Sequence, residues 1–195
     1  MPPERLEALI FDMDGTLIEP VLDFRAIRAE LGIPQDQGII ETIEAMPPDR
    51  RRLAGRLLIE RELSAARRAK LMPNAAETLR AARRAGLKTA LLTRNARKAM
   101  ELVLKRFKSL RFDLAWSREQ GPIKPEPDGI LRACRALGVE PGNTACVGDF
   151  RYDIIAAKSA GAVSILLAPG KRPDFADEAD YVIRDLKDLI ALLGI

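Results

Sequence analysis

Short apolar runs alternate with amphipathic segments along most of this 195-residue sequence. The runs are bounded by turn residues and have the length typical of buried parallel strands. The four clearest span residues 7–12, 88–93, 144–148 and 162–167, and residues 112–116 and 180–183 are predicted as shorter or edge strands. Helical patterns separate them at residues 74–86, 96–107, 127–138 and 153–161. This alternation predicts an α/β fold with a doubly wound, Rossmann-like parallel sheet.

One segment after the first strand breaks the alternation, because residues 17–72 carry helical patterns only. The predicted helices cover residues 22–32, 38–46 and 49–70. In the third helix, apolar residues at helical spacing predict one packing face, formed by Leu53, Leu57, Ile59, Leu63 and Ala66. We therefore expect a Rossmann-like core of residues 1–17 and 73–195, with a small all-helical cap of residues 18–72 over the carboxyl edge of the sheet.

The composition excludes several kinds of active site. Histidine is absent, which rules out a Ser-His-Asp triad, a Cys-His dyad and any His-ligated zinc site. The two cysteines, Cys134 and Cys146, lack a metal-binding spacing and are expected to be buried structural thiols. Chemistry in this chain must therefore use carboxylates, lysine, threonine and a hard metal ion.

The charge pattern argues against a nucleic-acid or membrane partner. The net charge is +4, and arginines cluster in residues 50–70, but Glu60 and Glu62 interrupt that run and no aromatic residue accompanies it. Such a segment is typical of a solvated helix rather than a nucleic-acid surface. The apolar runs are far shorter than the roughly 20 residues that span a bilayer. An acidic break in the first 12 residues is unlike a signal peptide, so we expect a cytoplasmic protein.

Polar residues follow the predicted strands at the edge where ligands of open α/β sheets bind. They are Asp12, Asp14, Thr93 and Asp149, with Asp153 one helical turn later and Lys124 in a loop that reaches the same edge. Several carboxylates without His or Cys suit Mg²⁺, while an ammonium and a hydroxyl suit phosphate oxygens. In this reading Asp12 attacks phosphorus and Asp14 transfers protons.

Each of these residues also has a structural alternative. Asp14 before Gly15 is a common turn pair, Thr93, Asp149 and Asp153 are suited to capping helices, and loop lysines such as Lys124 are usually solvated. Their occurrence together on one predicted edge favours a functional site.

Four motifs in order make the chain resemble a haloacid dehalogenase superfamily phosphatase of the phosphoglycolate-phosphatase-like branch. They are DMDGT at 12–16, LLTRN at 91–95, KPEP at 124–127 and GDFRYD at 148–153. The resemblance spans essentially the whole chain. It implies that Asp12 is the nucleophile and Asp14 the general acid/base, and that residues 18–72 correspond to the mobile helical cap of that family.

The same resemblance implies the remaining site residues. Mg²⁺ would be held by Asp12, the main-chain carbonyl of Asp14 and Asp149, with Asp153 as a ligand or a support for the ligands. Thr93 and Lys124 would act in catalysis by binding the transferring phosphoryl group. The predicted substrate-binding set is Gly15, Thr93, Arg94 and Lys124 from the core, with Arg25 and Arg28 from the cap.

The predicted function is a Mg²⁺-dependent phosphatase that hydrolyses a small phosphate monoester, phosphoglycolate-like or a sugar phosphate, through an aspartyl-phosphate intermediate. Its partner would be a small phosphorylated metabolite. The acid at position 14 argues against carbon-attacking dehalogenases and phosphonate-cleaving members.

Two alternatives stay open: a phosphomutase of the same superfamily, and a non-enzymatic phospho-accepting domain like the response-regulator receivers. Receivers are shorter, lack a helical insertion after the first strand and carry the phosphorylated aspartate on a later strand. The oligomeric state stays open too.

Overall fold

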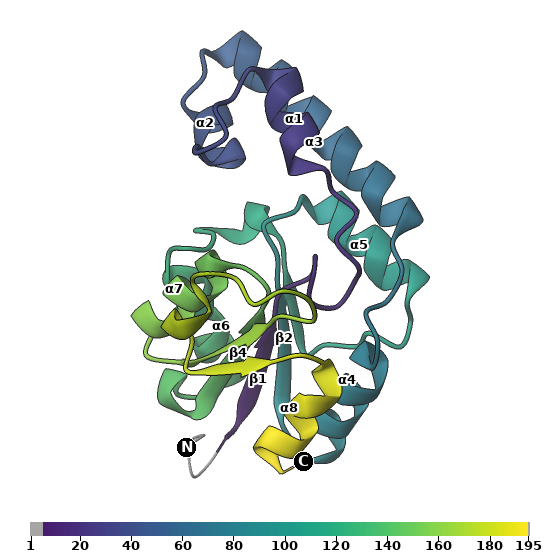
Figure 1. Cartoon of the computed structure of the whole chain (residues 1–195), viewed down its shortest axis with the longest axis vertical. Helices are drawn as coiled ribbons and strands as arrows, with labels where there is room; N and C mark the ends of the chain where they lie inside the picture. Colours follow the sequence, from purple (N-terminus) through teal and green to yellow (C-terminus); the bar gives the residue numbers. More distant parts are fainter. Residues whose placement is uncertain (1–5, 195) are drawn as a thin grey trace.

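A six-stranded parallel sheet forms the centre of the molecule in the computed structural model, which describes residues 6–194 (Figure 1). The strand order is β3-β2-β1-β4-β5-β6. The strands are β1 Ala8–Phe11, β2 Lys88–Leu92, β3 Leu114–Trp116, β4 Thr144–Gly148, β5 Val163–Leu167 and β6 Tyr181–Ile183. The chain runs outward from β1 to β3 and then returns to start a second set at β4, so the predicted doubly wound, Rossmann-like sheet is confirmed.

The register of the central strands aligns their carboxyl ends. Phe11 of β1 pairs with Leu91 of β2 on one side and with Val147 of β4 on the other. The ladder continues one step further, where the N–H of Asp12 donates to the carbonyl of Val147 at 2.9 Å. Residues that directly follow β1, β2 and β4 therefore emerge at the same edge of the sheet.

Alternate residues of the strands build two separate cores. Leu9 and Phe11 pack on one face with α4 Ala75–Arg84, α5 Arg97–Arg106 and α8 Leu186–Leu193. Ile10 faces the other way, where it packs with α6 Asp128–Leu137 and α7 Arg151–Ser159. Cys134 and Cys146 belong to this second core and are buried, as expected from the sequence. A central parallel strand is buried on both faces, which explains its continuous apolar sequence.

The cap consists of three helices above the carboxyl edge of the sheet (Figure 1). They are α1 Phe24–Leu31, α2 Ile39–Glu44 and α3 Pro48–Arg68. A small core of their own holds them together, made of Ile27, Ile33, Ile39, Ile43, Ala54 and Leu58. Two chain segments connect cap and core, and they lie side by side. The N–H of Glu19 donates to the carbonyl of Lys70, and the N–H of Met72 donates to the carbonyl of Leu17, both at 2.9 Å.

The predicted packing face of α3 is confirmed at Ala66 and wrong at Leu53. Leu53 is 56% exposed, whereas the buried residues are Ala54, Leu58, Glu62, Ala65 and Ala66. The prediction used apolar spacing alone, and it failed because the buried stripe of α3 includes a charged residue, Glu62.

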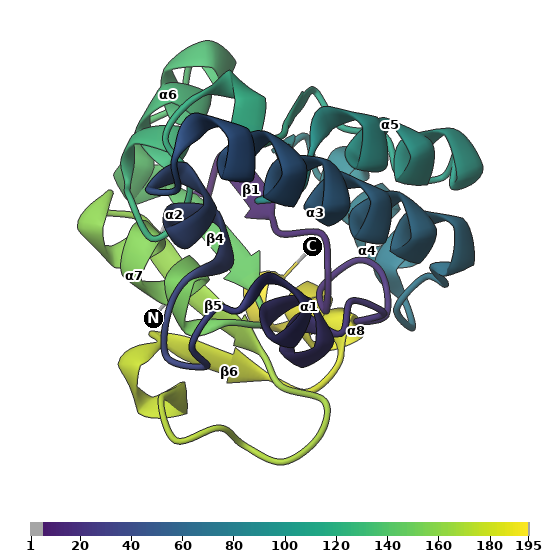
Figure 2. The same cartoon turned by 90° about the horizontal axis from the view of Figure 1, so that it is seen from above.

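The long helix α3 contacts both parts of the molecule. Its first half packs in the cap, while Ala66 and the following Ala69 join the large core, and α3 runs beside α5 (Figure 2). The division at residues 17/18 and 72/73 stays a prediction, and residues 1–5 and 195 of the predicted core lie outside the described residues.

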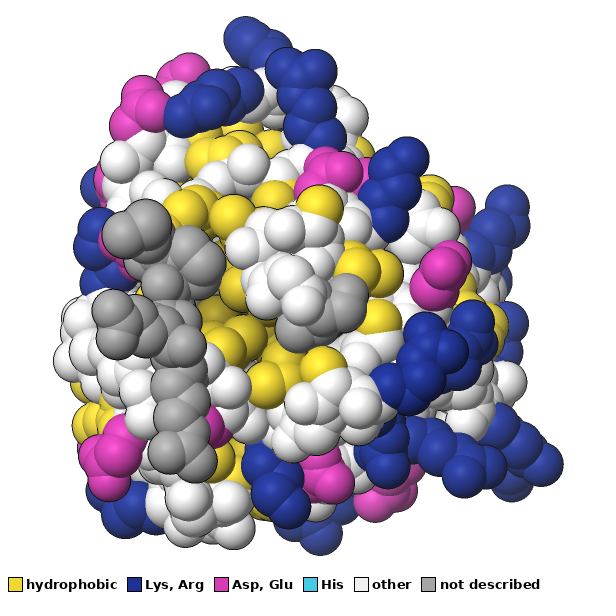
Figure 3. All heavy atoms as spheres, turned by 90° about the horizontal axis from the view of Figure 1, so that it is seen from below, with side chains coloured by type: hydrophobic (Ala, Val, Ile, Leu, Met, Phe, Trp, Pro, Cys, Tyr) yellow, Lys and Arg dark blue, Asp and Glu magenta, His cyan; other side chains and the backbone are white. Residues whose placement is uncertain are grey.

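The surface away from the cap carries mixed charge. Figure 3 shows Lys and Arg side chains at the rim of that face, with Asp and Glu side chains between them. Within residues 6–194, no helix has both the length and the hydropathy required to cross a membrane.

Candidate active site

Three carboxylates converge at the carboxyl edge of the sheet. Asp12 follows β1, Asp149 follows β4, and Asp153 lies in the first turn of α7. One oxygen from each lies within 4.8 Å of the others. Burial and mutual repulsion raise the pKa of Asp149, and burial raises that of Asp12 against the opposing charge of Lys124. Such a cluster of hard oxygen donors fits a divalent cation, which would offset the repulsion.

Gly15 allows the turn after β1 to lie against this cluster. Its φ is +75°, and a Cβ at this position would lie 2.0 Å from Oδ2 of Asp149. Any larger residue would therefore displace the Asp149 carboxylate as well as strain the backbone. The glycine of the first motif thus has a direct structural reason, and its predicted contact with substrate stays a prediction.

Lys124 reaches the cluster from the loop before α6. Its Nζ lies 2.5 Å from Oδ1 of Asp12 and 2.6 Å from Oδ1 of Asp153, and the residue is only 9% exposed. Burial alone would lower the pKa of this amine, but the charges of Asp12 and Asp153 outweigh burial and raise it. The ammonium therefore stays charged, and it links Asp12, the candidate nucleophile, to Asp153 in the first turn of α7.

Asp14 occupies a different environment from the three clustered acids. Its Oδ2 accepts a hydrogen bond from Nδ2 of Asn95 at 2.7 Å. Burial raises its pKa to about 7, and the charges of Asp12 and Glu62 act in the same direction. A carboxyl group with a pKa near neutrality is suited to both donating and accepting a proton.

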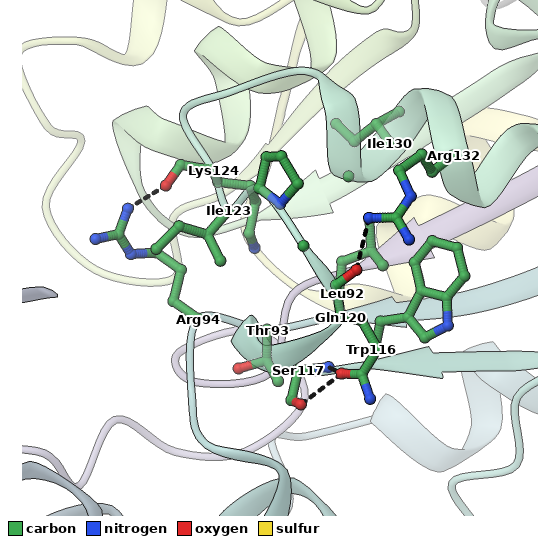
Figure 4. A pocket seen from close by; sticks show the side chains of 13 residues that line it. Leu92, Thr93, Arg94, Trp116, Ser117, Gln120, Ile123, Lys124, Ile130 and Arg132 are labelled. Atoms are coloured by element: carbon green, nitrogen blue, oxygen red, sulfur yellow. Dashed lines mark hydrogen bonds between the residues drawn. The ribbon is translucent and has the colours of Figure 1, made fainter. Parts of the chain in front are cut away.

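Thr93 and Arg94 follow β2 at the same edge (Figure 4). The Thr93 hydroxyl is buried and accepts from the N–H of Asn95 at 3.1 Å. The Arg94 guanidinium donates to the carbonyl of Lys124 and, at 2.8 Å, to the carboxylate of Glu41 on α2. Arg94 therefore connects the second motif, the lysine loop and the cap.

A cavity of about 440 Å³ lies over these residues and extends to the cap. Among the predicted site residues, it is lined by Asp12, Asp14, Arg28, Thr93, Arg94, Lys124, Asp149 and Asp153. Arg28 lines it from α1, but Arg25 is exposed and is not among the lining residues. The structure gives no support for a substrate contact by Arg25.

Several lining residues were not singled out from the sequence. They are Asn95, Glu62, Phe150 and Tyr152, with cap residues Ile39, Ile40 and Leu58. Asn95, Phe150 and Tyr152 stand inside quoted motifs, so the motifs contained a signal for them. Glu62 carried no such signal, because in the sequence it only interrupts a run of arginines.

The fold and this edge define a Rossmann-like α/β protein with a carboxylate site at the strand ends, beneath a helical cap. A family model described as haloacid dehalogenase-like hydrolase matches residues 6–161. A haloacid dehalogenase-like hydrolase domain-containing protein of Arabidopsis thaliana is 33% identical, with 93% of this chain and 84% of that protein covered. The chain belongs to the haloacid dehalogenase-like hydrolase family.

Further relatives support the predicted resemblance to the phosphoglycolate-phosphatase-like branch. A phosphoglycolate phosphatase of Pseudomonas syringae pv. tomato is 30% identical, covering 93% of this chain and 78% of that protein. Among solved structures, a HAD phosphatase from Thermococcus onnurineus is 28% identical with a TM-score of 0.72, covering 97% of this chain and 98% of that one. A hydrolase from Pseudomonas syringae has a TM-score of 0.82 at 21% identity, covering 96% and 98%, and shows the shared fold.

Proposed function

We propose that this hydrolase is a Mg²⁺-dependent phosphatase that cleaves small phosphate monoesters through an aspartyl phosphate on Asp12. The observation that carries the proposal is the separation of two neighbouring acids into different environments. Asp12 lies against Lys124 and the other clustered carboxylates, whereas Asp14 is held by Asn95 with a pKa raised to about 7. One acid is thus suited to attack and the other to move protons.

In the first step, a carboxylate oxygen of Asp12 forms a bond to phosphorus as the ester P–O bond breaks. Lys124 holds Oδ1 of Asp12 in place for the attack. Asp14 gives its proton to the departing alcohol oxygen. The buried Thr93 hydroxyl and the Lys124 ammonium bind phosphoryl oxygens.

In the second step, Asp14 takes a proton from water as the water oxygen attacks phosphorus. The bond between phosphorus and Asp12 breaks, which releases phosphate and restores both acids. Asp12, Asp149 and the main-chain carbonyl of Asp14 would hold Mg²⁺, with Asp153 as a ligand or support. When bound, the ion neutralises negative charge on the phosphoryl group.

The names of the relatives support phosphate chemistry. Besides the phosphoglycolate phosphatase, a protein of Halalkalibacterium halodurans named pyrophosphatase PpaX is 27% identical over 97% of this chain. The alternative of a phosphomutase would return the phosphoryl group to a substrate hydroxyl instead of water. A receiver-like, non-enzymatic role does not agree with membership in a hydrolase family.

Steady release of inorganic phosphate from p-nitrophenyl phosphate in the presence of Mg²⁺ tests the proposal. We expect many turnovers for the wild-type protein and none for Asp12→Asn, because an amide is a poor nucleophile. Asp174→Asn, an exposed aspartate outside the cavity, is the matched control. Stoichiometric phosphorylation without turnover, or activity of Asp12→Asn close to wild type, would contradict the proposal.

A further inference from the structure

The cavity has two chemically different ends. All the groups assigned to phosphoryl transfer lie on the core side, whereas the cap side is mainly apolar. The cap contributes Pro20, Leu22, Phe24, Ile39, Ile40 and Leu58, and the core adds the rings of Phe150 and Tyr152. The leaving group of a substrate bound at the core edge would therefore meet apolar side chains.

Two of these aromatic side chains are exposed in a way that large apolar residues rarely are. Phe24 is 47% exposed and Phe150 is 51% exposed, and only two other large apolar side chains of residues 6–194, Leu53 and Ile155, are exposed. Phe150 is held in place by edge-on contacts with Tyr152 and Phe175, at ring-centroid distances of 5.1 and 5.9 Å. Exposed apolar side chains that line one cavity mark a binding surface.

Two of the three cations that line the cavity are paired with carboxylates, and the third, Arg28, donates to main-chain carbonyls. Lys124 pairs with Asp12 and Asp153, and Arg94 binds the Lys124 carbonyl and the Glu41 carboxylate while its guanidinium lies over the Tyr152 ring. Arg28 donates through Nε to the carbonyl of Gln37 at 3.1 Å and through Nη1 to that of Phe24 at 3.4 Å.

The charged side chains that line the cavity are mainly acidic. Five carboxylates line the cavity (Asp12, Asp14, Glu62, Asp149 and Asp153), against the three cations Arg28, Arg94 and Lys124. A divalent ion would offset the excess of acids, of which Asp14 carries a proton in the first step, and the phosphoryl group would then add negative charge. A second anion on the substrate would lie against a mainly apolar wall whose one lining cation, Arg28, already donates to two main-chain carbonyls, so the added charge would be poorly compensated.

We infer that the preferred substrates are phosphate monoesters of neutral alcohols that carry an aromatic ring or a comparable apolar face, rather than an anionic group such as the carboxylate of phosphoglycolate. This inference rests on the proposed phosphatase function and narrows its substrate class. The ring of the alcohol packs between the cap residues Phe24 and Ile39 and the core residue Phe150.

Three esters of primary alcohols test the inference at equal Mg²⁺: benzyl phosphate, 2-phosphoglycolate and glucose 6-phosphate. They differ in the apolar or anionic character of the alcohol. We expect kcat/KM for benzyl phosphate to exceed that for each of the others by about 10-fold or more, since contacts of one aromatic ring and the exclusion of an unpaired charge add up. A higher kcat/KM for 2-phosphoglycolate or for glucose 6-phosphate would overturn the inference and leave the phosphatase proposal standing.

Substitutions of the aromatic residue Phe24 provide a second test of the inference. Phe24→Ala should lower the ratio of kcat/KM for benzyl phosphate to that for 2-phosphoglycolate by roughly 3- to 10-fold, and Phe24→Leu by less. Leu53→Ala is the matched control, because Leu53 is an apolar cap residue of similar exposure that lies outside the cavity. The same ratio in Phe24→Ala and in wild type would overturn the inference. If the protein hydrolysed none of the three esters and no p-nitrophenyl phosphate, the result would instead contradict the phosphatase function itself.

Discussion

Glu62 of the cap and Arg118 of the core form a buried ion pair, with Nη1 of Arg118 2.5 Å from Oε1 of Glu62. The second carboxylate oxygen of Glu62 accepts from the N–H of Ala96, directly before α5, at 3.0 Å. Arg118 also donates to the carbonyl of Arg94 at 3.0 Å. One acid from the cap thus contacts the loop of Thr93, Arg94 and Asn95 directly at Ala96 and, through Arg118, at Arg94.

Removal of this acid should destabilise the protein. In Glu62→Ala, the Arg118 guanidinium stays largely buried without its partner, and the Ala96 N–H loses its acceptor. Breaking a buried pair on one side typically costs about 3–5 kcal/mol in the free energy of unfolding. Urea denaturation, followed by circular dichroism, measures the change.

The exposed pair between Glu30 and Arg61 is the control for Glu62→Ala. Glu30→Ala should change the free energy of unfolding by only about 0–1 kcal/mol, because exposed ion pairs are screened by solvent. Equal effects of the two substitutions would show that the Glu62 pair contributes no more than a surface contact.

Metal dependence provides a second prediction. The convergence of Asp12, Asp149 and Asp153 predicts that activity is lost with EDTA and is restored by Mg²⁺. Asp149→Asn should raise the Mg²⁺ concentration needed for half-maximal activity, because one charged oxygen donor is lost. Titration of activity with Mg²⁺ measures this, with Asp174→Asn as the control. Full turnover in metal-free buffer would contradict the prediction.

Two aspartates that precede the edge strands, Asp113 and Asp180, are expected to make the stability of the fold sensitive to acid. Asp113 precedes β3, and its Oδ2 accepts from the N–H and the hydroxyl of Thr89 at 2.8 and 3.0 Å. Asp180 precedes β6 and accepts in the same way from Ser164, at 2.8 and 2.7 Å. Burial would raise the pKa of each carboxyl, but these hydrogen bonds outweigh burial and lower it below the ordinary 3.8.

A lowered pKa in the folded state stabilises the protein above the unfolded pKa. This contribution is complete above about pH 5, and it is lost as the pH falls through 3.8 toward the lower folded value. Asp113→Asn should therefore reduce the loss of stability between pH 5 and pH 3. Urea midpoints at the two pH values measure the effect. An unchanged pH dependence in the double variant Asp113→Asn, Asp180→Asn would contradict it.

Much of the sheet could be predicted from the sequence because buried parallel strands are continuous apolar runs. The strands β1, β2, β4 and β5 were predicted to within one residue at each end, and the two edge strands were found as well. The helix α8 was not predicted, although Asp185 before it accepts from the N–H of Lys187, as helix-capping aspartates do. The start of α7 was predicted two residues too late, because Arg151 and Tyr152 do not belong to its apolar stripe.

The site was only partly predictable, for a physical reason. Three of the four motifs sit at strand ends, where topology brings them together, so the positions of Asp12 and Asp149 follow from the fold, while Lys124 reaches the same edge from the loop before α6. Glu62 is different, because its partner Arg118 is 56 residues away in the sequence and no local pattern connects them. The contact depends on how α3 lies along α5, which only the packed structure defines.

The division of labour between Asp12 and Asp14 leads to the last prediction. Asp14→Asn should keep its place in the fold, because an asparagine oxygen can still accept the hydrogen bond from Asn95. It should also still bind Mg²⁺, since the proposed contact from residue 14 is the main-chain carbonyl. Turnover should fall by about 10²–10⁴-fold, the typical loss on removal of a general acid/base.

The size of that loss should depend on the leaving group. Nitrophenolate needs little protonation, so the attack of Asp12 on p-nitrophenyl phosphate should be slowed least. Hydrolysis of the aspartyl phosphate still needs a base, and stopped-flow measurement should therefore show a burst of nitrophenol followed by a slow phase in Asp14→Asn. The exposed cap residue Asp36 provides the control variant Asp36→Asn, which should behave like wild type. Equal steady-state rates of Asp14→Asn and wild type on an alkyl phosphate would remove Asp14 from proton transfer, and its raised pKa would then reflect burial beside Asp12 without a catalytic role.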